Sequence, residues 1–225
     1  HVAFVGNPNA GKTTLFNYVS GSQEHVGNYG GVTVDAKSAT FRFEGYEFNV
    51  VDLPGTYSIS AYSNEEKYVR EYIMNNAPDV VINVVDASNL ERNLYLTLQL
   101  LELGIPCIVA LNMLDIAEKQ NIRIEIDALS ARLGCPVIPL VSTRGRGIEA
   151  LKLAIDRYKA NENVELVHYA QPLLNEADSL AKVMPSDIPL KQRRWLGLQM
   201  LEGDIYSRAY AGEASQHLDA ALARL

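Results

Sequence analysis

The stretch Gly6-Asn7-Pro8-Asn9-Ala10-Gly11-Lys12-Thr13 decides the fold. It follows four apolar residues, Val2-Ala3-Phe4-Val5, and leads into apolar positions at helical spacing, Leu15, Phe16 and Val19. A strand, a G-x-x-x-x-G-K-[ST] loop and a helix in this order are the signature of the phosphate-binding P-loop. Backbone N–H groups of such a loop surround a phosphate, and the N-terminal end of the helix adds positive charge. The alternative is a turn that contains Gly-Lys-Thr by chance, and the flanking strand and helix argue against it.

The residue types in and after this loop indicate a nucleotide bound together with magnesium. The Lys12 ammonium can bridge the β- and γ-phosphates, and the Thr13 hydroxyl is a suitable Mg²⁺ ligand. Asp52-Leu53-Pro54-Gly55 matches D-x-x-G at the end of a strand-like run, forty residues after Lys12. There, Asp52 can hold Mg²⁺ through water, and the Gly55 amide can contact the γ-phosphate. Taken alone, Leu-Pro-Gly is equally consistent with a simple turn, but its distance from the P-loop favours the functional interpretation.

Asn112-Met113-Leu114-Asp115 predicts which base is bound. It ends a buried apolar run, and open α/β sheets bind ligands beyond the carboxyl ends of their strands. The Asp115 carboxylate can accept hydrogen bonds from N1–H and the 2-amino group of guanine, which adenine lacks. Asn112 can connect this loop to the P-loop or to the base. Met113 stands where GTPases usually have lysine (N-K-x-D), and its thioether chain can pack on the base as lysine methylenes do. The alternative is that Asn and Asp only cap a helix. Ser142-Thr143 fits the last nucleotide loop by position alone.

Two features predict slow hydrolysis assisted by a monovalent cation. Thr56 follows the D-x-x-G, where many switch GTPases carry a glutamine that orients the attacking water. No arginine in the loop 22–31 is placed to supply charge instead. The amide oxygen of Asn9 can help to hold a cation beside the β–γ bridge, where negative charge grows during phosphoryl transfer. The alternative role for Asn9 is a turn-stabilising side chain.

Thr33 lies in the first loop after the P-loop helix. A threonine there can complete the Mg²⁺ shell while the γ-phosphate is present and release it after hydrolysis. Val32-Thr33-Val34 is equally consistent with a plain strand.

The composition describes an ordinary globular chain of 225 residues, with 48% hydrophobic and 21% charged residues. Its net charge of −7, without a basic stripe, disfavours nucleic acid as a partner. Cys107 and Cys135 each lie beside a proline without metal-type spacing, so we expect two buried thiols in a reducing compartment. No apolar run reaches the ~18 residues of a membrane span. Because the chain starts at His1 without Met, almost on a strand, we expect a shortened chain.

Strand-like runs alternate with helical patterns from residue 2 to about 158. This predicts an α/β fold with a P-loop NTPase-type, mostly parallel sheet flanked by helices. From Gln171 onward, apolar residues occur at helical spacing between Pro and Gly, which predicts a small all-α bundle with Trp195 in its core. We therefore predict two domains, a G domain at 1–160 and a helical domain at 161–225.

The predicted elements are a strand at 2–5, a helix at about 12–20 capped by Gly21, a mobile loop at 22–31, one antiparallel hairpin with strands 32–43 and 46–51, a mobile segment at 56–64, a helix at about 65–76, a strand at 80–85, a helix at 90–103 capped by Gly104, a strand at 105–111, a helix at about 125–133, a strand at 137–141 and a helix at about 148–158.

Together, these motifs resemble the N-terminal cytosolic GTPase domain of the ferrous iron transport protein B family, along the whole chain. The resemblance is carried by GNPNAGKTTLFN (6–17), VGNYGGVTV (26–34), DLPGTYS (52–58), NVVDASNLERNLYL (83–96) and NMLD (112–115). Met113 is itself typical of the family.

The resemblance implies further roles. Asn9 matches the potassium-activating asparagine, with the backbone carbonyls of Gly27 and Tyr29 as further K⁺ ligands, and Thr33 matches the switch threonine. The family often has Trp where Tyr29 stands, but a backbone carbonyl makes the contact, so we expect potassium activation to be retained. Residues from about 165 match a helical, GDP-dissociation-inhibitor-like domain that stabilises GDP binding.

The resemblance also implies partners and a location. The iron-permeation domain of the family, with its several membrane spans, is not part of this chain. The implied partners are therefore that domain of the parent chain and small accessory iron-transport proteins. The parent would lie at the bacterial inner membrane, with this fragment soluble on its cytoplasmic face.

We therefore expect slow, Mg²⁺-dependent, K⁺-stimulated GTP hydrolysis, with GTP/GDP, Mg²⁺ and K⁺ as cofactors, that regulates ferrous iron uptake. The alternatives are a nucleotide-state binding switch, a soluble potassium-dependent GTPase serving RNA modification or ribosome assembly, and an ATPase if Asp115 does not meet the base. The predicted catalytic residues are Asn9, Lys12, Thr33 and Gly55. The predicted nucleotide-binding residues are Gly6, Asn7, Pro8, Asn9, Ala10, Gly11, Lys12, Thr13, Thr14, Gly31, Val32, Thr33, Asp52, Leu53, Pro54, Gly55, Asn112, Met113, Asp115, Val141, Ser142 and Thr143. The predicted metal ligands are Thr13, Thr33 and Asp52 for Mg²⁺, and Asn9, Gly27 and Tyr29 for K⁺.

Overall fold

The computed structural model describes residues 1–21, 24–26, 36–60, 62–158 and 168–225. The chain divides into two compact units. One comprises His1–Leu101 with Ile105–Val164, and the other comprises Glu102–Gly104 with Glu165–Leu225. Each unit has buried residues of its own, and each is described by itself.

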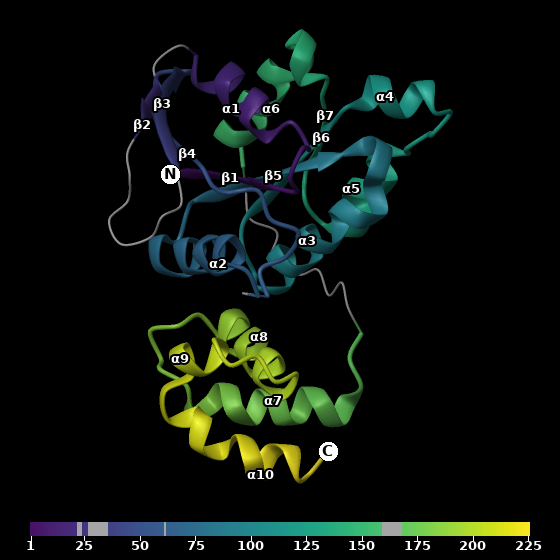
Figure 1. The fold of residues 1–225 in the computed structure, drawn as a ribbon. Coiled ribbons are helices and arrows are strands. Elements are labelled where there is room, and N and C mark those ends of the chain that lie inside the picture. The colour runs from purple at the N-terminus through teal and green to yellow at the C-terminus, as the bar shows by residue number, and fades with distance from the viewer. Residues whose placement is uncertain (22–23, 27–35, 61, 159–167) are drawn as a thin grey trace. The chain divides into compact units, whose positions relative to one another are not determined.

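A mixed, mostly parallel sheet forms the centre of the first unit (Figure 1). Its strands are β1 (Val2–Gly6), β2 (Glu24–Val26), β3 (Lys37–Phe43), β4 (Tyr46–Asp52), β5 (Val80–Asp86), β6 (Cys107–Asn112) and β7 (Val137–Pro139). They lie in the order β2-β3-β4-β1-β5-β6-β7. All neighbours from β4 to β7 pair parallel, whereas β3 pairs antiparallel with both β2 and β4.

Helices cover both faces of this sheet (Figure 1). They are α1 (Lys12–Ser20), α2 (Asn64–Asn76), α3 (Leu90–Glu102), α4 (Leu114–Lys119), α5 (Ile126–Leu133) and α6 (Ile148–Asp156). On one face, Leu15 and Phe16 of α1 and Leu151 of α6 share a hydrophobic cluster with Phe4 of β1. On the other face, apolar residues of α3 and α5 pack against β5 and β6. All six residues of β6 are buried, as expected for a parallel strand covered on both sides. The predicted mostly parallel sheet flanked by helices is confirmed.

Four local predictions differ from the structure, two in the existence of an element and two in the boundary of a strand. Residues 24–26, predicted as part of a loop, form β2, so the hairpin is not the only antiparallel pairing. A three-residue strand carries too little periodicity to be recognised, and pairing with β3 defines it. α4 was not predicted, since six residues do not show a helical period. β6 begins at Cys107 rather than at 105, after Pro106, which has no N–H to donate to a ladder. β7 ends at Pro139 rather than at 141.

Several predicted features lie outside the described residues. These are the remainder of the loop 22–31, apart from 24–26, and the segment 32–35 at the start of the predicted hairpin. The other helix boundaries agree with the predictions to within about two residues.

The second unit is helical. Its helices are α7 (Gln171–Val183), α8 (Leu190–Leu201), α9 (Ser207–Ala211) and α10 (Leu218–Leu222), together with a 3₁₀ helix at Gly212–His217. Trp195 is 2% exposed, which confirms it as a core residue. At the crossing of α7 and α8, a Cβ on Gly197 would lie 2.8 Å from the Ala177 carbonyl oxygen, so glycine permits the close approach. The Arg194 guanidinium donates to both Asp178 oxygens at 2.5 and 2.6 Å, which joins the same two helices.

Within the described ranges, no helix has both the length and the apolar character needed to cross a bilayer.

Candidate nucleotide-binding site

The P-loop connects the end of β1 to the start of α1, as predicted. A Cβ on Gly6 would lie 2.6 Å from the Val84 carbonyl oxygen of the neighbouring strand, so the loop leaves the sheet at a position that admits only glycine. Asn9 and Gly11 have left-handed φ values of 67° and 85°, and these bend the chain back toward the helix. α1 begins at Lys12, with Gly11 as its N-cap.

Three predicted site residues come together beside this loop. The Lys12 ammonium forms an ion pair with the Asp52 carboxylate, and the Thr13 hydroxyl donates to the other carboxylate oxygen at 3.0 Å. Lys12 and Asp52 are only 8% and 6% exposed. Parallel pairing of Phe4 with Asp52 places the carboxylate next to the P-loop. Hydroxyl and carboxylate oxygens are ligand types that Mg²⁺ prefers, so Thr13 could hold the ion directly and Asp52 could hold it through water.

The segment after Asp52 is bound to the P-loop. The Leu53 and Thr56 amides donate to the carbonyl oxygens of Phe4 and Gly6, each at 3.0 Å. A Cβ on Gly55 would lie 3.3 Å from Pro8 Cα, so the two backbones are in close contact. The Thr56 side chain is 2% exposed, and its hydroxyl donates to the Ser58 carbonyl at 2.7 Å. Thr56 is therefore engaged internally and is not available to orient water.

Asn112 links three loops of the site. Its Nδ2 donates to the Ala10 carbonyl at 3.0 Å, and its Oδ1 accepts the Ser142 amide at 2.9 Å. Asn112 is 1% exposed, so both bonds are shielded from water. Of the two roles predicted for Asn112, the structure supports the connection to the P-loop.

Asp115 lies in the first turn of α4, whose N-cap is Met113 with a left-handed φ of 62°. Neither Asn112 nor Met113 caps this helix through its side chain. The Asp115 carboxylate lies 3.9 Å from the Arg144 guanidinium and is 23% exposed, so a ligand can reach it. Thr143 is positioned by Tyr18, whose hydroxyl donates to its carbonyl at 3.4 Å.

The parallel sheet explains why these loops meet. β1, β4, β6 and β7 all point the same way, so the segments that follow them emerge at one edge, where open α/β sheets bind ligands. The predicted residues between 6 and 14, 52–55, 112–115 and 141–143 gather at this edge. Gly27, Tyr29, Gly31, Val32 and Thr33 lie outside the described residues, and their roles stay predictions.

Arg92 and Tyr57, to which the sequence analysis gave no role, lie beside the predicted site residues. The Arg92 guanidinium lies 4.2 Å above the centre of the Tyr57 ring, and the Arg92 carbonyl accepts a hydrogen bond from the Asn7 side chain. Arg92 lies within the NLERNLYL run, which was noted without a role. Its contacts depend on the packing of α3, which no local pattern reveals.

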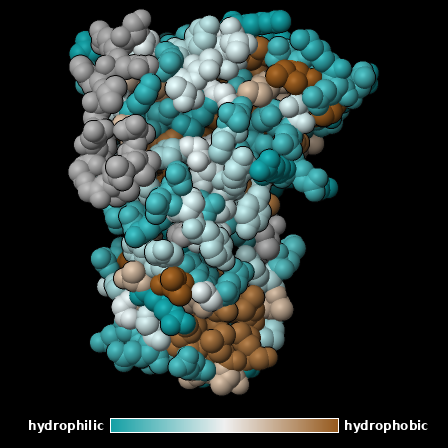
Figure 2. Space-filling model, viewed as in Figure 1, coloured by the Kyte–Doolittle hydropathy of each residue, from teal (hydrophilic) through white to brown (hydrophobic). Residues whose placement is uncertain are grey.

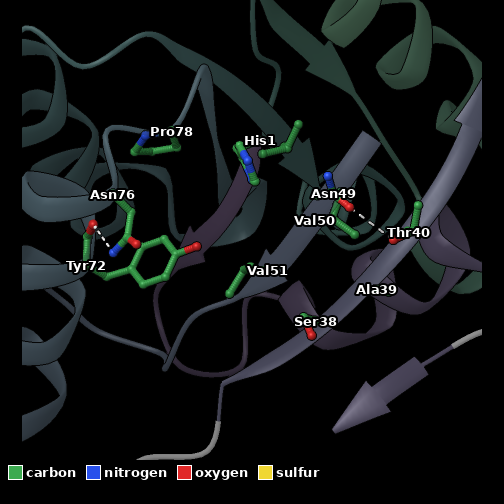
Figure 3. A pocket seen from close by; sticks show the side chains of 11 residues that line it. His1, Ser38, Ala39, Thr40, Asn49, Val50, Val51, Tyr72, Asn76 and Pro78 are labelled. Carbon is green, nitrogen blue, oxygen red and sulfur yellow. Dashed lines mark hydrogen bonds between the residues drawn. The ribbon is translucent and has the colours of Figure 1, made fainter. Parts of the chain in front are cut away.

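A separate pocket of about 420 Å³ lies at the other end of β1 (Figure 3). It is lined by His1, Thr40, Asn49, Tyr72 and Asn76 among others, and none of the predicted site residues lines it.

The fold and these motifs define the class: the chain has a P-loop GTPase fold. A model of the family described as ferrous iron transport protein B matches residues 1–155. The chain therefore belongs to the ferrous iron transport protein B family.

Named relatives agree with this assignment. Over the full length of this chain, the sequence is 78% identical to the Fe(2+) transporter FeoB of Escherichia coli K12 and 68% identical to that of Salmonella typhimurium. It spans 30% of the length of these relatives.

Solved structures show the same fold. The cytosolic domain of L. pneumophila FeoB matches with a TM-score of 0.84 and 33% identity, over 99% of this chain and 97% of that one. The apo cytosolic domain of T. maritima FeoB matches with a TM-score of 0.86 and 32% identity, over 99% of this chain and 91% of that one. NFeoB from S. thermophilus, bound to GDP·AlF4⁻ and K⁺, matches with a TM-score of 0.82 and 35% identity, over 99% of this chain and 88% of that one.

Proposed function

We propose that this chain binds GTP and GDP, hydrolyses GTP slowly, and thereby regulates ferrous iron uptake by a membrane domain outside it. The observation that carries the proposal is the pair of hydrogen bonds made by the Asn112 side chain. They join the P-loop at Ala10 to the loops after β6 and β7. The relatives named as Fe(2+) transporters, and the solved relative bound to GDP·AlF4⁻ and K⁺, support it.

In this proposal, each part of the nucleotide has its own partner. Backbone amides of the P-loop, from Gly6 to Thr14, and the Lys12 ammonium bind the phosphates. The Asp115 carboxylate accepts the N1–H and 2-amino hydrogens of guanine, while Met113 packs on the base. Thr13 and Asp52 are the described residues that would hold Mg²⁺, with Thr33 as a further ligand. Bound Mg²⁺ would offset the negative charge of the phosphate oxygens.

Slow turnover follows from what the site residues do. In this proposal the Gly55 amide contacts the γ-phosphate, while Thr56 donates its hydroxyl to the Ser58 carbonyl and does not activate water. We assign the missing charge stabilisation to K⁺, held by the Asn9 side chain and the carbonyls of Gly27 and Tyr29. Bound K⁺ would supply positive charge beside the β–γ bridge.

We further propose that the two units correspond to a G domain at 1–160 and a GDP-stabilising helical domain at 161–225. The division of the chain into two compact units supports this boundary. The proposed partners are the iron-permeation domain of the parent protein and small accessory iron-transport proteins, at the cytoplasmic face of the inner membrane. The family assignment disfavours the RNA-modification and ribosome-assembly alternatives.

Potassium dependence tests this function. GTP hydrolysis is measured in potassium and in sodium buffers for the wild type and for Asn9→Ala, with Asn75→Ala at an exposed position of α2 as the control. We expect faster hydrolysis in potassium for the wild type and the control, and no cation effect in Asn9→Ala. Equal rates in both buffers for the wild type would remove the potassium mechanism. Absence of hydrolysis and of guanine-nucleotide binding would remove the proposed function.

A further inference from the structure

Arg92, near the start of α3, contacts two parts of the proposed site at once. Its carbonyl oxygen accepts a hydrogen bond from Asn7 Nδ2 at 3.4 Å. Its guanidinium carbon lies 4.2 Å from the centre of the Tyr57 ring, within the range of a cation–π interaction. Arg92 therefore joins the P-loop to the segment that follows D-x-x-G.

The contact on the P-loop side is part-buried, and its Asn7 end lies in the interior. Asn7 is 4% exposed, and among the described residues its Oδ1 has no hydrogen-bond partner. The bond to Arg92 thus orients the Asn7 side chain. Since the bond is to the Arg92 backbone, it places the start of α3 against the P-loop whatever the side chain at 92.

The contact on the other side holds a residue close to Gly55. Tyr57 is two residues beyond Gly55, and the Thr56 amide between them donates to the Gly6 carbonyl at 3.0 Å. The Tyr57 side chain is 41% exposed, so packing alone does not hold its ring. Stacking under Arg92 restricts the ring, and with it the backbone that carries the Gly55 amide.

α3 holds the same segment at a second point. Gln99 Oε1 accepts the Ile59 amide at 2.9 Å, and Gln99 Nε2 donates to the Ser60 hydroxyl at 3.1 Å. Arg92 and Gln99 are seven residues apart, about two helical turns, so they lie on one face of α3. Gln99 holds the far end of the segment through one buried and one part-buried hydrogen bond, and Arg92 holds the end next to Gly55.

We propose that Arg92 is a positioning residue for GTP hydrolysis: by stacking on Tyr57 it keeps the Gly55 amide against the P-loop, where the γ-phosphate is held. This inference rests on the proposed function. GDP has no γ-phosphate, so the effect is confined to GTP and to the rate of hydrolysis. An exposed cation–π pair corresponds to a change of about two- to five-fold.

The test compares variants that remove the cation or the ring with variants that keep the pair. Arg92→Met removes the charge at similar length, Tyr57→Leu removes the ring, and Tyr57→Phe keeps it. Arg132→Met, at an exposed arginine of α5, is the matched control. For each protein, kcat and KM for GTP and the affinity for a fluorescent GDP are measured in potassium buffer.

We expect Arg92→Met and Tyr57→Leu each to lower kcat by about two- to five-fold, with unchanged GDP affinity. Tyr57→Phe and Arg132→Met should match the wild type, and the double variant Arg92→Met/Tyr57→Leu should be no slower than either single one, since each change breaks the same pair. Wild-type kcat in Arg92→Met, an equal loss of GDP affinity, or additive effects in the double variant would overturn the proposal.

A second measurement does not depend on hydrolysis. Amide hydrogen exchange of the peptide 53–60 is followed in the nucleotide-free proteins. We expect about two- to five-fold faster exchange in Arg92→Met and Tyr57→Leu, and wild-type exchange in Tyr57→Phe. Unchanged exchange would overturn the positioning role even if the wild type hydrolyses GTP. Faster exchange with an inactive wild type would instead show that the proposed function has failed while the Arg92–Tyr57 contact stands.

Discussion

Single polar side chains, rather than surface shape, organise the proposed site. Asn112 donates to one loop and accepts from another, so neither its amide nitrogen nor its oxygen is left unsatisfied. Met113 and Asn9 adopt left-handed backbone conformations that non-glycine residues rarely take. Such conformations persist where the surroundings impose them, and they cluster at functional sites.

The substitution Asp115→Asn tests whether this one carboxylate recognises the guanine base. Replacing it with asparagine removes an ionised acceptor of two guanine hydrogens, so we expect GDP affinity to fall by roughly 10- to 150-fold. Titration with a fluorescent guanine nucleotide measures this. Glu118→Gln, at an exposed position of the same helix, is the control and should bind as the wild type does. Equal affinity of Asp115→Asn and the wild type would show that this carboxylate does not meet the base.

The substitution Gly11→Ala tests the connection between the P-loop and Asn112. A Cβ at Gly11 would lie 2.4 Å from Asn112 Nδ2, and the residue has a left-handed φ of 85°. Backbone strain of about 1–2 kcal/mol and disruption of a buried hydrogen bond, about 1–3 kcal/mol, should together lower the free energy of unfolding of Gly11→Ala.

Gly45→Ala is the matched control for Gly11→Ala. Its φ of 86° is nearly the same, but no heavy atom lies within 4 Å of its Cβ position, so only the backbone strain applies. Urea unfolding followed by far-UV circular dichroism measures both variants. If both lose equal stability, the contact with Asn112 contributes nothing.

At the scale of elements, β6 and the segment leading into β7 connect the proposed base-binding loops to a buried pair of thiols. The register that pairs Val109 with Val137 continues toward Cys107 and Cys135, which are both buried, as predicted. A hydrogen bond with Cys135, together with burial, raises the pKa of the Cys107 thiol well above its ordinary value. The Cys107 amide also donates to the Tyr158 hydroxyl at 3.0 Å, which ties this end of β6 to the end of α6.

This raised pKa predicts a pH dependence of stability. The thiol ionises at a lower pH in the unfolded chain than in the folded one, so its contribution is complete below the unfolded pKa. It is lost as the pH rises from that value through the folded pKa, by up to about 1.4 kcal/mol per pH unit. Urea unfolding between pH 7 and about 10 should therefore show a steeper loss in the wild type than in Cys107→Ala. Parallel curves for the two proteins would contradict this.

Element prediction succeeded where the sequence pattern is long and local. β5 and β6 are predominantly apolar, and α1 and α3 show clear helical periods, so they were located to within about two residues. The failures, β2 and α4, have only three and six residues, too few to show a period. β2 exists because the edge of β3 offers it backbone partners, and the sequence of 24–26 does not encode that edge.

At the scale of the whole molecule, the two units carry different functions in our proposal. All the described site residues lie in the first unit, while Trp195, the single tryptophan of the chain, lies in the second. Figure 2 shows polar residues over much of the visible face of the first unit and an apolar patch on that of the second. Trp195 fluorescence therefore reports on the second unit alone.

The proposed effect of the helical unit on GDP binding must have a counterpart in the effect of GDP on the helical unit, and this can be measured. If the helical unit stabilises GDP binding, then GDP must stabilise the helical unit by the same free energy. We expect GDP with Mg²⁺ to raise the urea midpoint of the Trp195 fluorescence transition as well as that of the first unit. ATP with Mg²⁺ serves as the control and should shift neither. A Trp195 transition that does not move with GDP would contradict the proposed role of residues 161–225.

The sequence by itself determined the P-loop, the order of the principal elements and the type of each motif. These depend on residues close together in the chain, where glycine positions and apolar periods act locally. Only the tertiary structure decided that Asn112 bonds Ala10 across 102 residues, and that Arg92 meets Asn7 across 85. These contacts arise because parallel strands bring their carboxyl ends to one edge, and neither partner carries a local signal of the other.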